Sequence, residues 1–310
     1  MTQASSPTLY LVMPTWNQRA DTLECLESLA RSTYPQYRVV VIDNGSNDGT
    51  VEAVLSRFPD VQFICNETNR GFAAAVNQGL RRALEQEADY VLVLNNDTVA
   101  DPAMLDGLMA VSRGAPASMV VPKIYYYSRP NIVWSVGALM NWWTFELKGN
   151  VHDQQDTGQW ENVTERQFAT ACAALMPRRL VESVGFLDER FFYYYDDADW
   201  SLRVLEAGFR ILLAPQAKLW HKVAGASGGV DTPYQRYWLG RSSVLFFRKH
   251  VRGWRWLIVF PYRVGSALKT TMRLLAQHRA VSARAYWRGL GDGLCKARQG
   301  AKPQIVARDR

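Results

Sequence analysis

The sequence predicts an α/β fold in which helices flank a doubly wound, mostly parallel sheet, followed by a basic helical extension. Apolar runs alternate with helical patterns through the first third of the chain, and polar segments directly follow these runs. Strand–helix alternation at this spacing is typical of doubly wound units, whose ligands bind at the carboxyl ends of the strands. Residues 241–310 carry 16 Lys and Arg but only 2 Asp and Glu, which sets the extension apart.

Four apolar runs in the first third are interpreted as strands. The run Val39–Ile42 is apolar throughout, as expected for a parallel strand that helices cover on both faces. After the first run, Leu23, Leu26 and Leu29 recur at helical spacing. The expected strands are residues 8–14, 37–46, 61–67 and 90–97, and the expected helices are residues 20–33, 48–58 and 71–86.

The middle of the chain, residues 118–195, is richer in aromatic residues and less regular. It predicts short strands and loops, with one helix from about Arg178. A second helix is expected over residues 197–207, closed by Gly208 and followed by a strand. From about Tyr234 onward the pattern is that of amphipathic helix with basic residues throughout.

The spacing of the cysteines and the hydropathy of the chain indicate the cellular compartment in which the protein is expected. The four cysteines share no CxxC spacing, so we expect reduced thiols rather than a disulfide framework. The first residues lack the basic start of a signal peptide, and the apolar run Trp256–Tyr262 is far shorter than the roughly 20 residues of a membrane span. These features predict a cytoplasmic protein.

The charge of the chain is unevenly divided. Residues 1–240 carry 20 Lys and Arg and 27 Asp and Glu, so the basic balance lies wholly in residues 241–310. There, Arg and Lys are mixed with Trp, Leu and Phe at helical spacing. Such a helix can lie in the interface of an anionic membrane without crossing it; a basic helix packed on the rest of the protein is the alternative. We expect peripheral membrane association.

Polar residues that could bind a ligand or a metal ion follow several of the expected strands. Asp43 can accept a hydrogen bond from a nucleotide or can cap the turn Asn44–Gly49, and the sequence leaves both open. Asp97 ends another strand. A site that holds a metal ion on a phosphate usually has two carboxylates at such a position, and this segment has only one. His221 follows a later strand, either as a structural residue or as a further metal ligand.

Three acids form a cluster at the start of an expected helix. Asp196, Asp197 and Asp199 directly follow the aromatic run Phe191–Tyr195. Helix capping would explain one or two of them. Because like charges this close repel, the cluster predicts a bound cation or a shared proton, and a carboxyl pKa raised toward that of a general base.

Six segments resemble family 2 glycosyltransferases in their order and at roughly their intervals, over about residues 8–250. They are VMPTWNQ, VVVIDNGSNDGT, NRGFAAAVNQG, YVLVLNNDT, GFLDERFFYYYDDADWSLRVLEAGFRILLAP and WHKVAGAS. Within that family the chain is most similar to bacterial rhamnosyltransferase-like enzymes that build cell-surface polysaccharides. The resemblance implies a GT-A fold, a Rossmann-like nucleotide-diphospho-sugar transferase fold.

The resemblance also implies a division of the chain. Residues 1–235 would form the GT-A catalytic domain, with a nucleotide-binding half up to residue 115 and an acceptor-side half from residue 116. Residues 236–310 would be the basic helical extension.

Site residues follow from the same resemblance. Asp197 matches the catalytic base of the family, with Asp196 and Asp199 in support, and Asp97 with His221 matches its metal site for Mg²⁺ or Mn²⁺. The resemblance supports binding of the donor phosphate by Arg241 less strongly, because Ser242 replaces the Asn that often follows this Arg in relatives. The implied donor-binding residues are Thr15, Asn17, Asp43, Arg70, Asn77, Asn95, Asn96 and Arg241.

The expected activity is inverting, metal-dependent transfer of a sugar. The donor would be a dTDP- or UDP-sugar, with dTDP-rhamnose as the single best candidate, and the acceptor a glycan or a polyprenyl-diphosphate-linked saccharide. One base opposite the leaving group implies inversion, with no covalent sugar intermediate. A nucleotidyltransferase and a catalytically inactive basic module that binds membrane or RNA are the alternatives. A nucleotidyltransferase would require a Gly-rich phosphate-binding loop after the first strand, but the sequence there is PTWNQRAD, which contains no glycine.

Overall fold

The computed structural model describes residues 7–148, 152–223 and 230–295. Contacts divide the chain into two compact units. The first comprises Met1–Phe192 with Asp196–Gly229, and the second comprises Tyr193–Tyr195 with Val230–Arg310. Each unit is described by itself. Residues 296–310 of the expected extension and the end of the WHKVAGAS segment lie outside the described residues.

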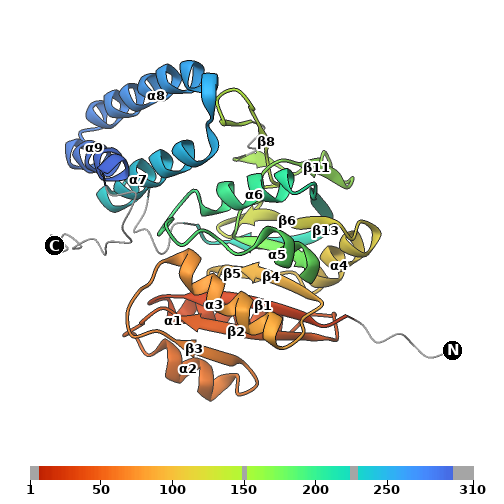
Figure 1. The fold of residues 1–310 in the computed structure, drawn as a ribbon. Helices are drawn as coiled ribbons and strands as arrows, with labels where there is room; N and C mark the ends of the chain where they lie inside the picture. Colours follow the sequence, from red (N-terminus) through yellow and green to blue (C-terminus); the bar gives the residue numbers. More distant parts are fainter. Residues whose placement is uncertain (1–6, 149–151, 224–229, 296–310) are drawn as a thin grey trace. The chain divides into compact units, whose positions relative to one another are not determined.

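The first unit begins with the strand–helix alternation that the sequence predicts (Figure 1). Strands β1, β2 and β3 pair in parallel in that order, and β4 pairs in parallel with the other side of β1. The α/β prediction is therefore confirmed. The elements are β1 (Leu9–Thr15), α1 (Arg19–Leu29), β2 (Tyr37–Asp43), α2 (Thr50–Arg57), β3 (Gln62–Cys65), α3 (Phe72–Glu85) and β4 (Tyr90–Leu94).

The second half of the sheet is mixed rather than parallel. Strand β12 pairs antiparallel with β4, β6 and β7 form an antiparallel pair, and the long strand β13 runs parallel to β6 but antiparallel to β5. These elements are β5 (Thr98–Ala100), α4 (Met104–Gly114), β6 (Ser118–Tyr126), β7 (Arg129–Ser135), β12 (Ala173–Pro177), α5 (Arg178–Val184), α6 (Asp196–Glu206) and β13 (Arg210–His221). Short strands β8 (Leu139–Met140), β9 (Leu147–Lys148), β10 (Gln154–Gln155) and β11 (Thr164–Arg166) complete the unit.

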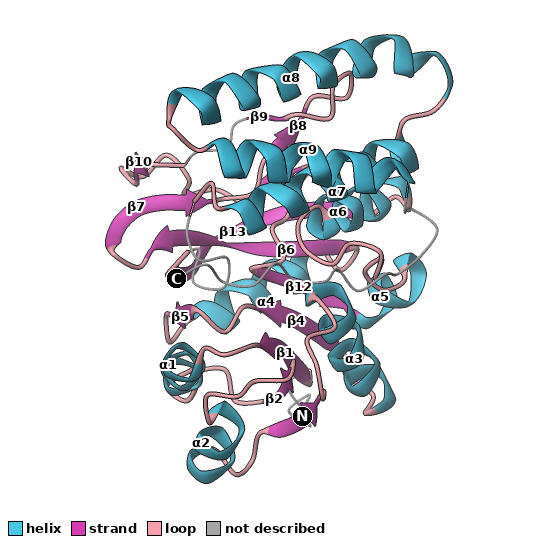
Figure 2. Ribbon diagram, turned by 90° about the vertical axis from the view of Figure 1, so that its left-hand side faces the viewer, coloured by secondary structure: helices cyan, strands magenta, loops and turns pink. Residues whose placement is uncertain are grey.

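Helices cover both faces of the sheet (Figure 2). Alternate residues of β1 belong to two separate apolar clusters, because successive side chains of a strand point to opposite faces. One cluster includes α1 and α4, and the other includes α3, α5 and α6. Helix α3 approaches the sheet closely at Gly79, where an added Cβ would lie 2.4 Å from Cγ1 of Val12.

The second unit is helical, as the basic pattern predicts. It contains α7 (Pro233–His250), a 3-10 turn η1 (Gly253–Arg255), α8 (Trp256–Ala276) and α9 (Ala280–Cys295). Glycines let α7 and α9 pack closely: an added Cβ at Gly289 would lie 2.1 Å from the Tyr237 carbonyl oxygen. None of the helices in the described ranges is long and apolar enough to cross a membrane.

Candidate active site

The carboxyl ends of β1, β2 and β4 bring predicted site residues together. The parallel register places Thr15 opposite Asp43. The Asn96 side chain donates to the Thr15 hydroxyl at 3.2 Å and to the Thr22 hydroxyl at 3.0 Å. Thr22 on α1 was not singled out by its sequence position, and it fixes both predicted residues. Thr15 and Asn96 therefore shape this edge of the sheet by binding each other.

Asp43 caps the turn that follows it, and one of its two carboxylate oxygens is left over. Its Oδ2 accepts hydrogen bonds from the backbone amides of Gly45 (3.1 Å) and Ser46 (2.9 Å), which caps the turn. Its Oδ1 is buried and has no hydrogen-bond partner among the described residues. A buried carboxylate oxygen without a partner is costly, so this atom is suited to accept a hydrogen bond from a ligand. Asn17 supports the same turn, since its Oδ1 accepts from the Asn47 amide at 2.8 Å.

The remaining residues predicted to bind the donor differ in their contacts with the protein and in their exposure to solvent. Asn77 is buried and both ends of its amide bind protein: Oδ1 accepts from the Leu187 amide at 3.0 Å, and Nδ2 donates to the Leu187 carbonyl at 2.9 Å. The structure thus gives Asn77 a structural role in holding the loop before α6. The Arg70 side chain is exposed. Arg241 lies on α7 in the second unit, over the ring of Trp238, and its donor role stays a prediction.

Strand pairing brings Asp97 and His221 together across 124 positions of sequence. In the antiparallel β5–β13 pair, His221 lies opposite Thr98, and the Lys222 amide donates to the Asp97 carbonyl at 3.0 Å. His221 Nε2 lies 3.1 Å from Asp97 Oδ1. This oxygen and Nδ1 of His221 are buried without a partner in hydrogen-bond geometry within the described part of the chain.

These two side chains fit a divalent cation. Two ligands at right angles on an octahedral ion with bonds of about 2.1 Å lie about 3 Å apart, close to the observed separation of Nε2 and Oδ1. No group of three or more His, Cys, Asp or Glu within the described ranges could hold a metal. Asp97 and His221 would supply two ligands of such an ion, and other oxygens would complete its shell. The unpartnered Asn95 Oδ1 lies two residues from Asp97.

Two neighbours of His221 were not recognised from the sequence. Trp134 on β7 packs edge-on against the imidazole, with ring centroids 4.5 Å apart. Burial lowers the pKa of His221, whereas the adjacent Cys172 sulfur and Asp97 carboxylate raise it, to about 10. A cation would displace the imidazole proton, since metal ligation needs the free nitrogen lone pair. No local sequence pattern indicates these contacts, because only the folded sheet brings β7 and residue 172 to β13.

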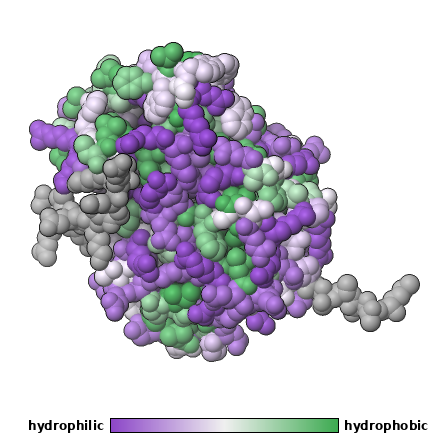
Figure 3. Space-filling view, viewed as in Figure 1, coloured by the Kyte–Doolittle hydropathy of each residue, from purple (hydrophilic) through white to green (hydrophobic). Residues whose placement is uncertain are grey.

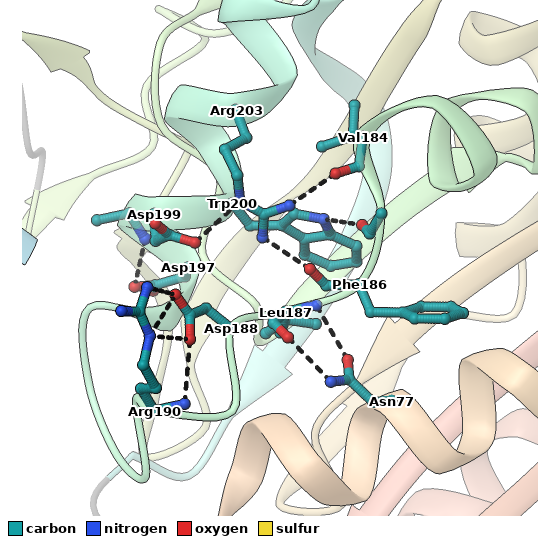
Figure 4. A network of polar contacts seen from close by, with 12 residues as sticks. Asn77, Val184, Phe186, Leu187, Asp188, Arg190, Asp197, Asp199, Trp200 and Arg203 are labelled. Atoms are coloured by element: carbon teal, nitrogen blue, oxygen red, sulfur yellow. Dashed lines mark hydrogen bonds and ion pairs between the residues drawn. The ribbon is translucent and has the colours of Figure 1, made fainter. Parts of the chain in front are cut away.

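The three acids at the start of α6 occupy different environments. Asp199 has no exposed surface and pairs with Arg203 one turn later, with Nε 3.0 Å from Oδ2. Arg203 also donates to the carbonyl oxygens of Val184 and Phe186, each at 2.8 Å. Figure 4 shows this network beside Asn77, which binds the same loop. Asp199 is thus neutralised and serves to anchor the helix.

The pKa values of Asp196 and Asp197 are both raised, but the two side chains differ in their exposure. Burial, and then the charge of Asp197, raise the pKa of Asp196 well above its ordinary value. Burial also raises the pKa of Asp197, to about 6, while the backbone amides of Ala198, Asp197 and Ala171 oppose this shift. Asp197 is partly exposed, whereas Asp196 is 5% exposed. Asp197 therefore has the access and the pKa of a general base at neutral pH.

Two consecutive residues connect this base to the Asn95–Asp97 segment. The Ala171 amide lies against the Asp197 carboxylate and lowers its pKa. The next carbonyl, of Cys172, accepts a hydrogen bond from the Asn95 amide at 2.8 Å. The segment is itself held by Ser201, whose hydroxyl accepts from the Ala169 amide at 3.0 Å. The Asp197 carboxylate and the Asn95–Asp97 segment therefore contact consecutive residues of the first unit.

Acids thus lie at the carboxyl ends of the strands of this sheet, and an acidic helix start follows them in the same unit. The family model "Glycosyl transferase family 2" matches residues 10–185. The chain belongs to this family, and the fold, family and enzyme class expected from the sequence are confirmed.

Curated relatives match most of the chain. It is 25% identical over 257 residues to a dTDP-rhamnosyl transferase of Shigella flexneri, covering 78% of this chain and 80% of that protein. It is 25% identical over 274 residues to an N-acetylglucosaminyl-diphospho-decaprenol L-rhamnosyltransferase of Mycobacterium tuberculosis, covering 82% and 89%.

Solved structures share the fold at low identity. The mannosyltransferase PcManGT from Pyrobaculum calidifontis, in complex with GDP-Man and Mn²⁺, matches with a TM-score of 0.59 and 17% identity, covering 94% of this chain and 88% of that one. GalNAc-T7 with UDP, GalNAc and Mn²⁺ matches with a TM-score of 0.58 and 16% identity, covering 78% and 50%.

Proposed function

We propose that this glycosyltransferase moves a sugar, with inversion, from a nucleoside diphosphate to a saccharide or lipid-linked saccharide in cell-surface polysaccharide synthesis. The single observation that carries the proposal is the bridge from Asp197 through Ala171 and Cys172 to Asn95, which joins a base of suitable pKa to the Asp97–His221 pair. The names of two relatives make rhamnose the favoured sugar. Family membership favours sugar transfer over the nucleotidyltransferase and inactive-module alternatives.

The donor would bind at the carboxyl ends of β1, β2 and β4. Asp43 Oδ1 would accept a hydrogen bond from the N–H of a pyrimidine base, which satisfies its buried lone pairs. Asn17 keeps the Asp43 turn in place. Asp97 and His221 would hold Mg²⁺ or Mn²⁺, and the bound ion would supply positive charge to the departing diphosphate.

Asp197 would perform the proton transfer. Its carboxylate would take the proton of an acceptor hydroxyl while the hydroxyl oxygen attacks the anomeric carbon. The bond from that carbon to the diphosphate breaks with its electron pair leaving on the nucleotide. The raised pKa of Asp196 disfavours a second negative charge beside the base. One carboxylate opposite the leaving group makes the transfer inverting, without a covalent sugar–enzyme intermediate.

The acceptor side of the proposal rests on one relative and on charge. The mycobacterial relative is named for a decaprenol-linked acceptor, and a polyprenyl-linked acceptor is held in a membrane. The basic character of residues 241–310 suits an anionic membrane surface. We therefore propose peripheral association with the membrane that carries the acceptor.

A donor screen tests the function. Purified full-length protein is mixed with dTDP-rhamnose, UDP-sugars and GDP-sugars, with and without Mn²⁺ or Mg²⁺, and with lipid extract as the acceptor source. We expect nucleoside diphosphate release from one donor class only, abolished by chelation, and an inverted anomeric centre in the product by NMR. Release from no donor, or undiminished release after chelation, would refute the corresponding part of the proposal.

A further inference from the structure

Helix α8 exposes a continuous apolar face to solvent. The exposed residues recur at intervals of three and four positions, which places their side chains on one side of a helix. Figure 3 shows hydrophobic residues at the surface over α8, at the top of the view. This apolar stripe consists of Leu257 (79% exposed), Phe260 (62%), Val264 (43%), Leu268 (51%), Met272 (69%) and Leu275 (52%).

The stripe is not the packing face of the helix. Val259, Ala267 and Leu274 are the buried residues of α8, and they lie on a different side from the stripe. A surface helix ordinarily buries its apolar side and turns polar residues outward. Helix α8 therefore carries more apolar surface than its packing uses, and an exposed apolar patch of this kind typically marks an interaction site.

The helix is held in this orientation by contacts inside the second unit. Arg273 Nη1 lies 2.8 Å from Asp231 Oδ2, just before α7. The indole of Trp287 on α9 donates to the Thr271 hydroxyl at 2.9 Å. These two contacts fix the helix within the second unit, while the stripe residues remain 43–79% exposed.

Charge identifies the kind of partner. Residues 232–291 contain twelve Lys and Arg and no Asp or Glu. Trp254, 60% exposed, precedes the helix, and tryptophan favours the boundary between head groups and hydrocarbon. A second copy of the chain would bring two such basic surfaces together, and their repulsion opposes self-association through the stripe. An anionic bilayer complements both the charge and the apolar side chains.

We propose that the apolar stripe of α8 lies in the head-group region of a bilayer that contains anionic phospholipid, with the helix in the plane of the membrane. The inference rests on the proposed function only for its biological purpose, which is to hold the enzyme beside a lipid-linked acceptor. It specifies which side chains enter the lipid, and it treats the basic residues as the electrostatic part of the binding.

Vesicle flotation of the full chain tests the stripe. The vesicles contain phosphatidylcholine alone or with 30% phosphatidylglycerol. The test variant is Phe260→Ser with Leu268→Ser. The matched control is Leu55→Ser with Val163→Ser, two exposed apolar residues of the first unit (46% and 51% exposed). Thermal melting checks that each variant folds, and nucleoside diphosphate release without lipid checks the active site.

We expect the wild type and the control to float with the anionic vesicles and the stripe variant to lose at least about tenfold in binding, since each buried side chain contributes. Donor turnover without lipid should match the wild type in both variants, which separates this inference from the proposed function. Equal flotation of the stripe variant and wild type would overturn the inference, as would absence of wild-type flotation. Light scattering that shows a wild-type dimer, broken by the stripe variant without any vesicle binding, would assign the stripe to self-association instead.

Discussion

Three neighbouring aspartates acquire three protonation environments within one turn of helix. Asp199 is fully buried and paired with Arg203, Asp196 is buried with a pKa well above its ordinary value, and Asp197 is partly exposed with a pKa of about 6. The amino-acid type is the same in each case, so the difference comes from burial and from the partner that each carboxyl group finds.

Replacing the base separates catalysis from binding. Asp197→Asn should lower the transfer rate by about 10²–10⁴, the range for loss of a general base, while calorimetry should find donor affinity nearly unchanged. The matched control is Asp196→Asn, which changes the neighbouring acid in the same way; because Asp196 is only 5% exposed, this variant should keep most of the activity. If Asp197→Asn loses donor binding instead, Asp197 belongs to the donor or metal site.

The rate should depend on pH through Asp197. The base must be ionised, and its raised pKa places the loss of activity at higher pH than for an ordinary aspartate. We expect kcat/KM to be flat above about pH 7 and to fall about tenfold per pH unit below about 6. Stopped assays in constant ionic strength, with circular dichroism to confirm folding, check this. A profile that stays flat to pH 5 in folded enzyme would contradict the assignment.

At the scale of elements, close packing of α3 on the sheet holds the nucleotide side in shape. Gly79 faces Val12 on β1 and Ile42 on β2, and an added Cβ would lie 2.4 and 2.6 Å from their side-chain carbons. Asn77, on the same helix, holds the loop that leads to α6. One helix thus connects strand packing to the position of the acids.

Gly79→Ala should destabilise the protein despite the better helix propensity of alanine. Overpacking typically costs about 1–3 kcal/mol, more than the roughly 1 kcal/mol that propensity returns. Urea unfolding measures the change. Gly114→Ala is the control, because nothing lies within 4 Å of its added Cβ. Val12→Ala should partly relieve the Gly79→Ala defect, and strictly additive losses would argue against the contact.

At the scale of the whole molecule, the chain leaves the first unit for three residues just before the acids. Tyr193–Tyr195 belong to the second unit. Tyr194 and Tyr195 both have positive φ, 65° and 67°, a strained conformation for non-glycine residues. Ser242 on α7 donates to the Tyr193 carbonyl at 2.8 Å, so the helical unit fixes the backbone four residues before Asp197.

Ser242→Ala should therefore slow transfer. Loss of one hydrogen bond of about 1 kcal/mol corresponds to a decrease in kcat of up to about tenfold, with little change in KM. Ser243→Ala is the matched control, because its equally buried hydroxyl donates to Gly240 of its own helix at 2.8 Å. Steady-state kinetics measures kcat and KM for both variants. An equal decrease in kcat for Ser242→Ala and Ser243→Ala would contradict a role of the Ser242 hydrogen bond in positioning the base.

Much of this protein was predictable from local sequence. Strand–helix alternation, the polar residues after β1, β2 and β4, and the basic helices all follow from periodicity and charge, which depend on neighbouring residues. Asp97 and Asp197 also stand out locally, as acids at a strand end and a helix start.

Tertiary structure decided what distant segments do to one another. Pairing of β5 with β13 sets His221 beside Asp97, and the Ala171–Cys172 backbone contacts both Asn95 and Asp197. It also gave Asn77 a structural role that its motif did not indicate. The sequence by itself determined the elements, their charges and the acids available. Which carboxyl groups have a raised pKa, and which one lies beside a histidine, depended on burial and partners that only folding supplies.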